Sequence, residues 1–208
     1  TVEISLYRGD WPYEMSYQGI PAGVPLVGDE TLEELRALDH VQNASRYLSR
    51  QDYNVVFHKK TGLSGGYVKG VDENYFHTCG YIMKEGRGFT EEDFKNYRKV
   101  AILDEDSAEA LFLGEEAVGS TIEIKKEPYV VIGVVTKMKE FEPTINSIED
   151  YYMYAQNSAG SVYVPESTWP IIYQFDEPQN VALRVENTDH MTEAGRSGAD
   201  ILNGTLSV

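Results

Sequence analysis

The chain has 208 residues, which is enough for one domain or for two small ones. Its 34 acidic and 18 basic side chains give a formal net charge of −16, which argues against nucleic-acid partners and against electrostatic docking on anionic lipid. A single cysteine, Cys79, excludes an intrachain disulfide. The longest apolar run, Tyr129 to Val135, is far shorter than the ~20 residues that span a bilayer.

The first half of the chain predicts a strand, a loop, a helix and three further strands. Residues 1–7 alternate apolar and polar side chains, as a half-buried strand does, and residues 9–28 are rich in glycine, proline and aromatic residues, as in an irregular loop. "DETLEELRAL" predicts a helix, with capping-box spacing between Thr31 and Glu34. The next three strands are expected in "HVQNASRYLSR", "DYNVVFHK" and "GGYVKGV".

The second half repeats this alternation of strands and helices. "KVAILD" predicts a buried strand that leads into a helix at "DEDSAEALF", whose acidic residues favour the first helical turn. "STIEIKK" and "PYVVIGVVTKM" predict two strands with a hairpin break at Glu127-Pro128. A strand and a helix beginning near Pro165, the strand "NVALRVEN" and a helix over 188–202 follow. The pattern indicates an α+β fold.

Residues 136–160 have no clean period and contain three tyrosines close together, Tyr151, Tyr152 and Tyr154. Tyrosine is enriched at binding hot spots, so these residues are candidates for a partner contact. They are equally compatible with a small core beneath a long loop. We expect at least one of the three in the core and mobility on either side of them.

No residue pattern in the sequence predicts catalysis, a cofactor or a metal. The four histidines, His40, His58, His77 and His190, lack the spacing of metal ligands. The acidic run 104–109 lacks the glycine and the final glutamate of a calcium loop, and the glycine-rich run 62–70 lacks the ending of a phosphate loop. No serine lies in a nucleophile elbow. We therefore expect no catalytic, cofactor-binding or metal-binding residues.

Two blocks, from Val68 to Phe94 and from Lys99 to Val135, together resemble the MacB-like periplasmic core domain of bacterial ABC transporter permeases. The resemblance covers roughly Thr31 to the C-terminus, and the tyrosine-rich segment has no counterpart. The matching residues of the first block are Gly70, Val71, Tyr75, Phe76, Gly80, Glu85, Gly86 and Arg87, and those of the second are Val100, Leu103, Ala108, Leu111, Phe112, Val118, Gly119, Ile132, Gly133 and Val134.

The matched residues have a physical interpretation of their own. Gly70 and Gly80 predict tight turns. Tyr75 and Phe76 predict a large apolar anchor, and Arg87 is placed to cap or pair at a corner.

The resemblance implies an α+β fold with two subdomains. Residues 1–97 with 178–208 would form a porter-like βαβ-type subdomain, and residues 98–177 a mixed α/β subdomain inserted into it. The chain would cross between them near Tyr97 and near Pro178, and we expect no single sheet to run through both.

The resemblance also implies a function and a location. Such a domain lies on the extracytoplasmic side of the membrane, between the first two membrane helices of a permease, so we expect this chain to be a piece of a longer protein. It would not be an enzyme: a partner ATPase would hydrolyse ATP, and the domain would transmit the motion and contact substrate or an adaptor protein during export. The permeases would pair through membrane helices, leaving the isolated domain monomeric or weakly dimeric. The alternatives are a secreted or surface-anchored module that binds a peptide or glycan, and a hydrolase whose carboxylates converge only in three dimensions.

Overall fold

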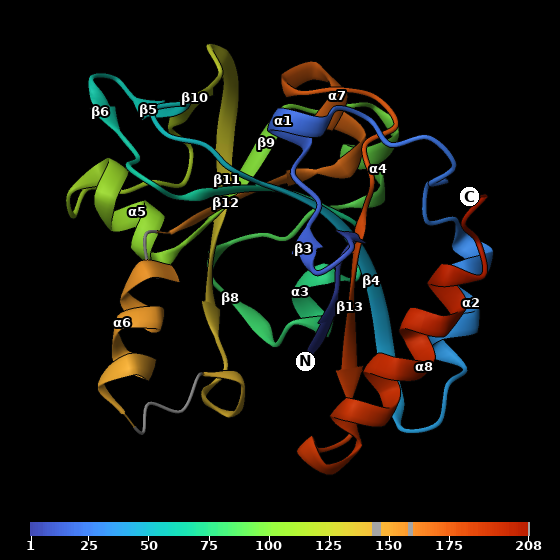
Figure 1. The fold of residues 1–208 in the computed structure, drawn as a ribbon. Coiled ribbons are helices and arrows are strands. Elements are labelled where there is room, and N and C mark those ends of the chain that lie inside the picture. The colour runs from blue at the N-terminus through green and yellow to red at the C-terminus, as the bar shows by residue number, and fades with distance from the viewer. Residues whose placement is uncertain (143–146, 158–159, 208) are drawn as a thin grey trace.

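The computed structural model describes residues 1–142, 147–157 and 160–207, and within them the side chains of residues 16, 17 and 153–157 lie outside the description. Its main feature is one mixed sheet of 11 strands with helices on both sides (Figure 1). Strand β12 pairs in parallel with β7, and β11 pairs in parallel with β9. The α+β fold expected from the sequence is confirmed.

The strands of the sheet follow the order β1-β13-β4-β7-β12-β9-β11-β10-β5-β6, and β8 pairs with β11 off this path. A two-stranded hairpin, β2 with β3, stands apart. The bounds are β1 Val2–Ile4, β2 Tyr7–Arg8, β3 Trp11–Pro12, β4 Val41–Gln51, β5 Val56–His58, β6 Thr61–Gly62, β7 Tyr67–Val71, β8 Tyr81–Gly86, β9 Val100–Asp104, β10 Thr121–Ile124, β11 Glu127–Lys137, β12 Ser161–Pro165 and β13 Asn180–Val185.

The helices are short, and two of them lie together at one end of the sheet, where α2 contacts α8 (Figure 1). The bounds are α1 Met15–Gln18, α2 Asp29–Arg36, α3 Tyr75–Thr78, α4 Glu91–Lys95, α5 Glu105–Phe112, α6 Ile148–Asn157, α7 Trp169–Ile172 and α8 Met191–Asn203, with 3₁₀ turns η1 Lys139–Phe141, η2 Glu166–Thr168 and η3 Thr188–His190.

Three groups of buried apolar side chains hold the layers together. One lies between α2, α8 and strands β1, β13 and β4, with Leu35 and Leu183 fully buried. The largest contains Trp169 and side chains of β5, β7 and β9 to β12. The third surrounds Tyr75 and Tyr163 and confirms the predicted anchor, since Tyr75 is 1% exposed and Phe76 packs against this group. Burial on this scale is the dominant favourable contribution to folding.

The expectation that no single sheet would run through both parts of the chain is wrong. Strand β12, which belongs to residues 98–177, lies between β7 and β9 and pairs with both. Its pairing with β7 runs from Ser161 opposite Tyr67 to Pro165 opposite Val71, so the backbone ladder crosses the expected boundary. The division into 1–97 with 178–208 and 98–177 stays a prediction.

The hairpin between β10 and β11 turns two residues earlier than expected. Lys125 and Lys126 have φ values of 48° and 70°, so both occupy the left-handed region that tight two-residue hairpins require. Pro128 lies inside β11, opposite Glu123. Strand β9 pairs with β11 only from Val130 onward, so the missing N–H of Pro128 leaves no gap in that ladder.

Helix α2 begins at Asp29 with Gly28 as its N-cap, so the capping box expected at Thr31 is absent there. The capping box instead occurs at α4, between Thr90 and Asp93.

Two other local features differ from expectation. Gly70 lies within β7 rather than in a turn. A Cβ there would lie 2.7 Å from Cε3 of Trp169, so the close approach of this ring accounts for the glycine. The segment 136–160 contains η1 and α6.

Candidate functional site

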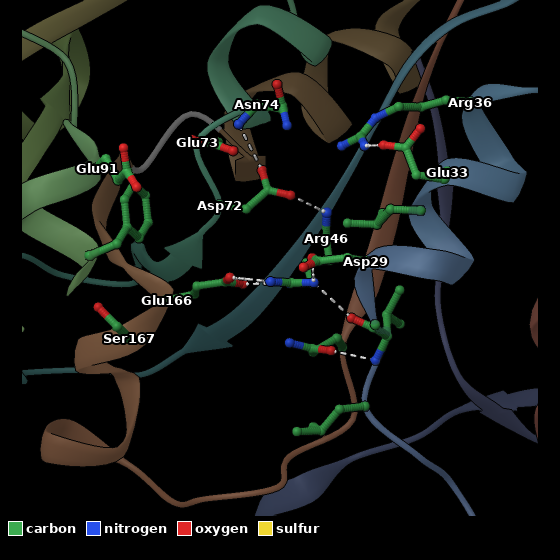
Figure 2. A pocket seen from close by; sticks show the side chains of 16 residues that line it. Asp29, Glu33, Arg36, Arg46, Asp72, Glu73, Asn74, Glu91, Glu166 and Ser167 are labelled. Carbon is green, nitrogen blue, oxygen red and sulfur yellow. Dashed lines mark hydrogen bonds and ion pairs between the residues drawn. The ribbon is translucent and has the colours of Figure 1, made fainter.

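A cavity of about 810 Å³ lies where α2, β4, α4 and η2 meet (Figure 2). Its walls come from both expected subdomains: α2 and β4 belong to residues 1–97, and η2 belongs to 98–177. Apolar side chains of α2 and α4 line it together with a group of charged side chains centred on Arg46. Because the junction brings charged side chains distant in the sequence together around one cavity, it is a candidate functional site.

Arg46 joins the two sides of the cavity. Its Nε atom donates to both carboxylate oxygens of Glu166, at 3.1 and 3.0 Å, and Nη2 donates to Oε1 at 2.7 Å. Its Nη1 atom donates to the Asp29 carboxylate at 2.9 Å and to the Val27 carbonyl at 3.0 Å (Figure 2). One guanidinium on β4 therefore connects the start of α2 to η2.

The two ion pairs of Arg46 differ in strength. The side chains of Arg46 and Glu166 are 20% and 18% exposed, whereas Asp29 is 92% exposed. Hydrogen bonding to Glu166 raises the pKa of Arg46, against the opposing effect of burial. A bidentate, partly buried pair of this kind is stronger than an exposed one, so Glu166 is the main partner.

Asp72 lies beside this pair and fixes the turn after β7. Its carboxylate accepts hydrogen bonds from Ser45 Oγ at 2.6 Å, from the Arg46 backbone N–H at 3.0 Å and from the Asn74 backbone N–H at 3.0 Å. Burial raises its pKa, although these hydrogen bonds act in the opposite direction. Asp72 therefore holds the backbone of β4 in place beneath the Arg46 side chain.

A second set of contacts joins the far end of β4 to α7 and the loop after it. Arg50 forms a salt bridge with Glu177, which is 3% exposed, and Trp169 Nε1 donates to the same carboxylate at 2.7 Å. The Arg50 guanidinium lies 4.6 Å from the Tyr173 ring centroid, and the Tyr173 hydroxyl donates to Asp52 at 2.8 Å. Strand β4 thus contacts residues 98–177 at its middle, through Arg46, and at its C-terminal end, through Arg50.

The corner predicted at Arg87 also lies close to the cavity, through α4. Arg87 Nη1 donates to the Asp93 carboxylate at 2.7 Å, and Arg98 lies 3.4 Å from it. Burial alone would raise the pKa of Asp93, but the hydrogen bonds from Arg87 and Thr90 lower it to about 2. The Asp93 carboxylate is therefore ionised throughout the physiological range and anchors α4 to the corner.

The tyrosines singled out in the sequence lie elsewhere, on α6 (Figure 1). Tyr151 is 57% exposed and Tyr152 is 63% exposed, and their rings pack edge to face with centroids 5.9 Å apart. Neither belongs to a core, contrary to one of the two interpretations, and the side chain of Tyr154 lies outside the described residues. A partner contact at this surface stays a prediction.

The histidines and the cysteine have structural surroundings. The rings of His40 and His190 stack with centroids 3.5 Å apart, and His58 stacks on Phe112. Burial raises the pKa of the Cys79 thiol to about 12, so it is protonated and unreactive at neutral pH. Within the described part of the chain, no three His, Cys, Asp or Glu side chains converge as metal ligands would. No described helix is both long enough and apolar enough to cross a bilayer.

Sequence reasoning missed the Arg46 cluster. A signal was present, because Arg46 and Arg50 stand within a strand that otherwise buries several of its side chains. A buried arginine requires a partner, but the identity of Glu166, 120 residues away, follows only from the pairing of β12 with β7.

Comparison with known proteins identifies the family. Residues 4–197 match the family described as the MacB-like periplasmic core domain. The ABC transporter permease YvrN of Bacillus subtilis is 33% identical over 187 residues, which cover 89% of this chain and 43% of that protein. The chain therefore spans less than half of this relative's length.

Two solved structures share the fold. The extracellular domain of the ABC-type transporter YknZ from Gram-positive bacteria superposes with a TM-score of 0.63 at 20% identity, over 98% of this chain and 92% of that one. The periplasmic region of MacB from Actinobacillus actinomycetemcomitans gives 0.62 at 19% identity, over 97% and 81%. The chain belongs to the MacB-like periplasmic core domain family, the extracytoplasmic domains of ABC transporter permeases.

Proposed function

We propose that this domain transmits ATP-driven motion of its permease to the extracytoplasmic side during export, with ATP hydrolysed by a partner subunit or cytoplasmic domain. The observation that carries the proposal is the set of contacts that Arg46 makes, called here the Arg46 clamp. From β4, Arg46 binds Val27 and Asp29 at the start of α2 and Glu166 in η2, and so connects α2 to η2. Helix α2 packs with α8, and η2 leads directly into α7. A displacement of the α2–α8 layer would therefore be passed to α7 through the Arg46 side chain.

The clamp is suited to a relay because it adds side-chain contacts to a continuous sheet. The sheet resists bending between β4 and β12, and the Arg46–Glu166 pair prevents the surface elements above it from sliding separately. The ring of Trp169 packs over Gly70 between these strands, which leaves little free volume for independent movement.

The test uses a full-length permease carrying this domain, reconstituted with its ATPase. In the variant Glu166→Gln we expect ATP hydrolysis to continue while export falls, because the motor still runs but its movement is poorly transmitted. The matched control is Asp29→Asn, which alters the exposed partner of the same arginine and should leave export nearly unchanged. Equal export by parent and Glu166→Gln would contradict the relay.

We further propose that α6 is the surface that contacts an adaptor protein or the substrate. Tyr151 and Tyr152 present two large exposed rings side by side, which is the chemistry that binding hot spots favour. The variant Tyr151→Ala/Tyr152→Ala should lose export or adaptor capture, whereas Tyr7→Ala/Tyr53→Ala, which removes two comparably exposed rings elsewhere, should not. Unchanged export in the α6 variant would sink the contact role and leave the relay standing.

A further inference from the structure

A second cavity, of about 930 Å³, lies between β1, α3, β8, η1 and β13, and it shares no lining residue with the cavity at Arg46. Its volume is in the range of pockets that hold small organic ligands, roughly 300–1,000 Å³. Tyr75, Tyr81 and Phe141 provide aromatic walls, and Met138 and Met191 add flexible apolar surface. Neither the relay nor the α6 surface uses this cavity.

Three cationic side chains line the cavity, and each rests on aromatic rings. Lys69 Nζ lies 5.7 Å from the ring centroid of Tyr47, 5.5 Å from that of Tyr67 and 6.0 Å from that of Tyr75. Lys137 Nζ lies 5.3 Å from the Tyr81 ring centroid. The Arg184 guanidinium lies 5.0 Å from the Phe141 ring centroid. Cation–π contacts are favourable but do not neutralise charge.

Within the described part of the chain, none of the salt bridges includes Lys69, Lys137 or Arg184. Lys69 has one side-chain hydrogen bond, a long one of 3.4 Å to the Tyr75 hydroxyl, and Arg184 donates to the His77 carbonyl at 3.0 Å. Three cations without an ion-pair partner at one cavity are notable in a chain with 34 acidic side chains.

The four carboxylates of the cavity, Glu3, Glu140, Glu142 and Glu186, are all exposed, while Lys69, Lys137 and Arg184 are partly buried. Glu3 lies nearest to the cations, since it hydrogen-bonds to the Tyr47 hydroxyl and attracts Lys69. Glu186 already accepts a hydrogen bond from His40. Water solvates and screens the exposed acids, whereas the cations have lost part of their hydration. The three cations therefore favour an anion, and the four acids, Glu3 above all, disfavour a ligand with several negative charges.

Lys69 has the strongest need of a counter-charge. Burial lowers its pKa, and the Glu3 carboxylate offsets only part of that effect, while the nearby Lys137 lowers the pKa further. Burial removes part of the hydration of the Lys69 ammonium group, and a bound anion would stabilise the charge in its place.

We propose that this cavity binds a small organic monoanion with an apolar body, whose acidic head group contacts Lys69, Lys137 and Arg184 while its body packs on Tyr75 and Phe141. The head group is a carboxylate or a chemically similar anion, because such oxygens accept from ammonium and guanidinium groups. An aromatic or aliphatic body of modest size fits the walls. The site is independent of the proposed export function, because its lining includes neither the residues of the cavity at Arg46 nor Tyr151 and Tyr152.

The experiment titrates the 208-residue chain with phenylacetate and, as a probe of the same shape and opposite charge, with phenethylammonium. Calorimetry or NMR should show saturable binding of phenylacetate and none of phenethylammonium. The pKa of Lys69, followed by side-chain NMR, should rise toward its ordinary value when phenylacetate is bound. Saturable binding of both probes, or of neither, would overturn the proposal.

The variant Lys69→Met keeps an unbranched apolar side chain, one atom shorter, and removes the charge. We expect phenylacetate affinity to fall by about tenfold or more, since a charge-assisted contact is lost. Lys60→Met, which removes an exposed lysine outside the cavity, is the matched control and should bind as the parent does. Arg184→Met supplies a second variant should Lys69→Met fold poorly, and its affinity should fall as well. Parent affinity in a folded Lys69→Met chain would contradict the proposal.

Discussion

Two neighbouring regions of the chain, η2 with α7 and helix α6, use their aromatic and charged side chains in opposite ways. At η2 and α7, Trp169 is 1% exposed and Glu166 and Glu177 are each held by an arginine of β4. On α6, Tyr151 and Tyr152 are 57% and 63% exposed and contact each other. The first region has its partners within the chain, and the second presents side chains suited to an external one.

This difference indicates which region holds the domain together and which is free to bind. Truncating a side chain at the junction removes packing and leaves a buried charge without its partner, so stability should fall. Truncating an exposed tyrosine removes little that the folded chain needs. The following experiments rank the expected losses of stability and so test the contrast directly.

The largest effect is expected for Trp169→Ala. The ring is among the largest fully buried side chains, and its loss also deprives Glu177 of the Trp169 N–H donor. The free energy of unfolding, measured with denaturant, should fall by about 3–5 kcal/mol. Ile171→Ala, on the same helix but 40% exposed, should cost clearly less. Equal costs for the two variants would show that α7 is not anchored as described.

The next effect concerns the corner and depends on pH. The pKa of Asp93 is lowered from 3.8 to about 2, so its ionised form stabilises the fold by about 2 kcal/mol above pH 4. Because the folded-state pKa is the lower one, this contribution is lost as the pH falls from about 4 to 2. Asp93→Asn should lack this contribution at every pH, so its free energy of unfolding should change less than the parent's between about pH 4 and 2. An identical acid profile in both proteins would contradict this assignment.

A smaller effect is expected for the clamp itself. Glu166→Gln removes the charge of a partly buried partner and should lower the free energy of unfolding by about 1–2 kcal/mol. Asp29→Asn removes a 92% exposed partner of the same arginine and should change stability by less than about 0.5 kcal/mol. If the order of the two variants were reversed, Glu166 would not be the main partner of Arg46.

The smallest effect is expected on α6. Tyr151→Ala/Tyr152→Ala should change the free energy of unfolding by less than about 0.5 kcal/mol, because surface substitutions away from packed features have little effect. Thermal melting of this variant beside the parent checks the expectation. A melting temperature well below the parent's would show that these rings belong to a core, as the side chains of η2 and α7 do.

The sequence predicts the local elements well where one period dominates. The alternation in "NVALRVEN" and the apolar run in "KVAILD" predict β13 and β9, and the anchor at Tyr75 is confirmed. The turn at Lys125-Lys126 was missed because neither lysine is typical of left-handed backbone. The shared sheet was missed because the pairing of β12 with β7 is set by tertiary packing rather than by either strand's own pattern.

The candidate site was harder to predict for the same reason. Arg46 could be noted as a charge on a half-buried strand, but Glu166 becomes its partner only after the sheet has formed. The tyrosines of α6 were visible as a cluster, whereas their exposure depends on how α6 stands relative to the sheet. Residues adjacent in sequence were predictable, and residues brought together by long-range pairing were not.

Native-state hydrogen exchange tests the central claim, that the junction makes the two parts move as one body. The measurement compares the opening free energy of amides in β12 with that of amides in β13. Our account predicts the same value for both strands, because β12 lies inside the common sheet and Arg46 holds β4 to η2. Opening of β12 at a markedly lower free energy than β13 would show that residues 98–177 open alone, and would contradict the relay.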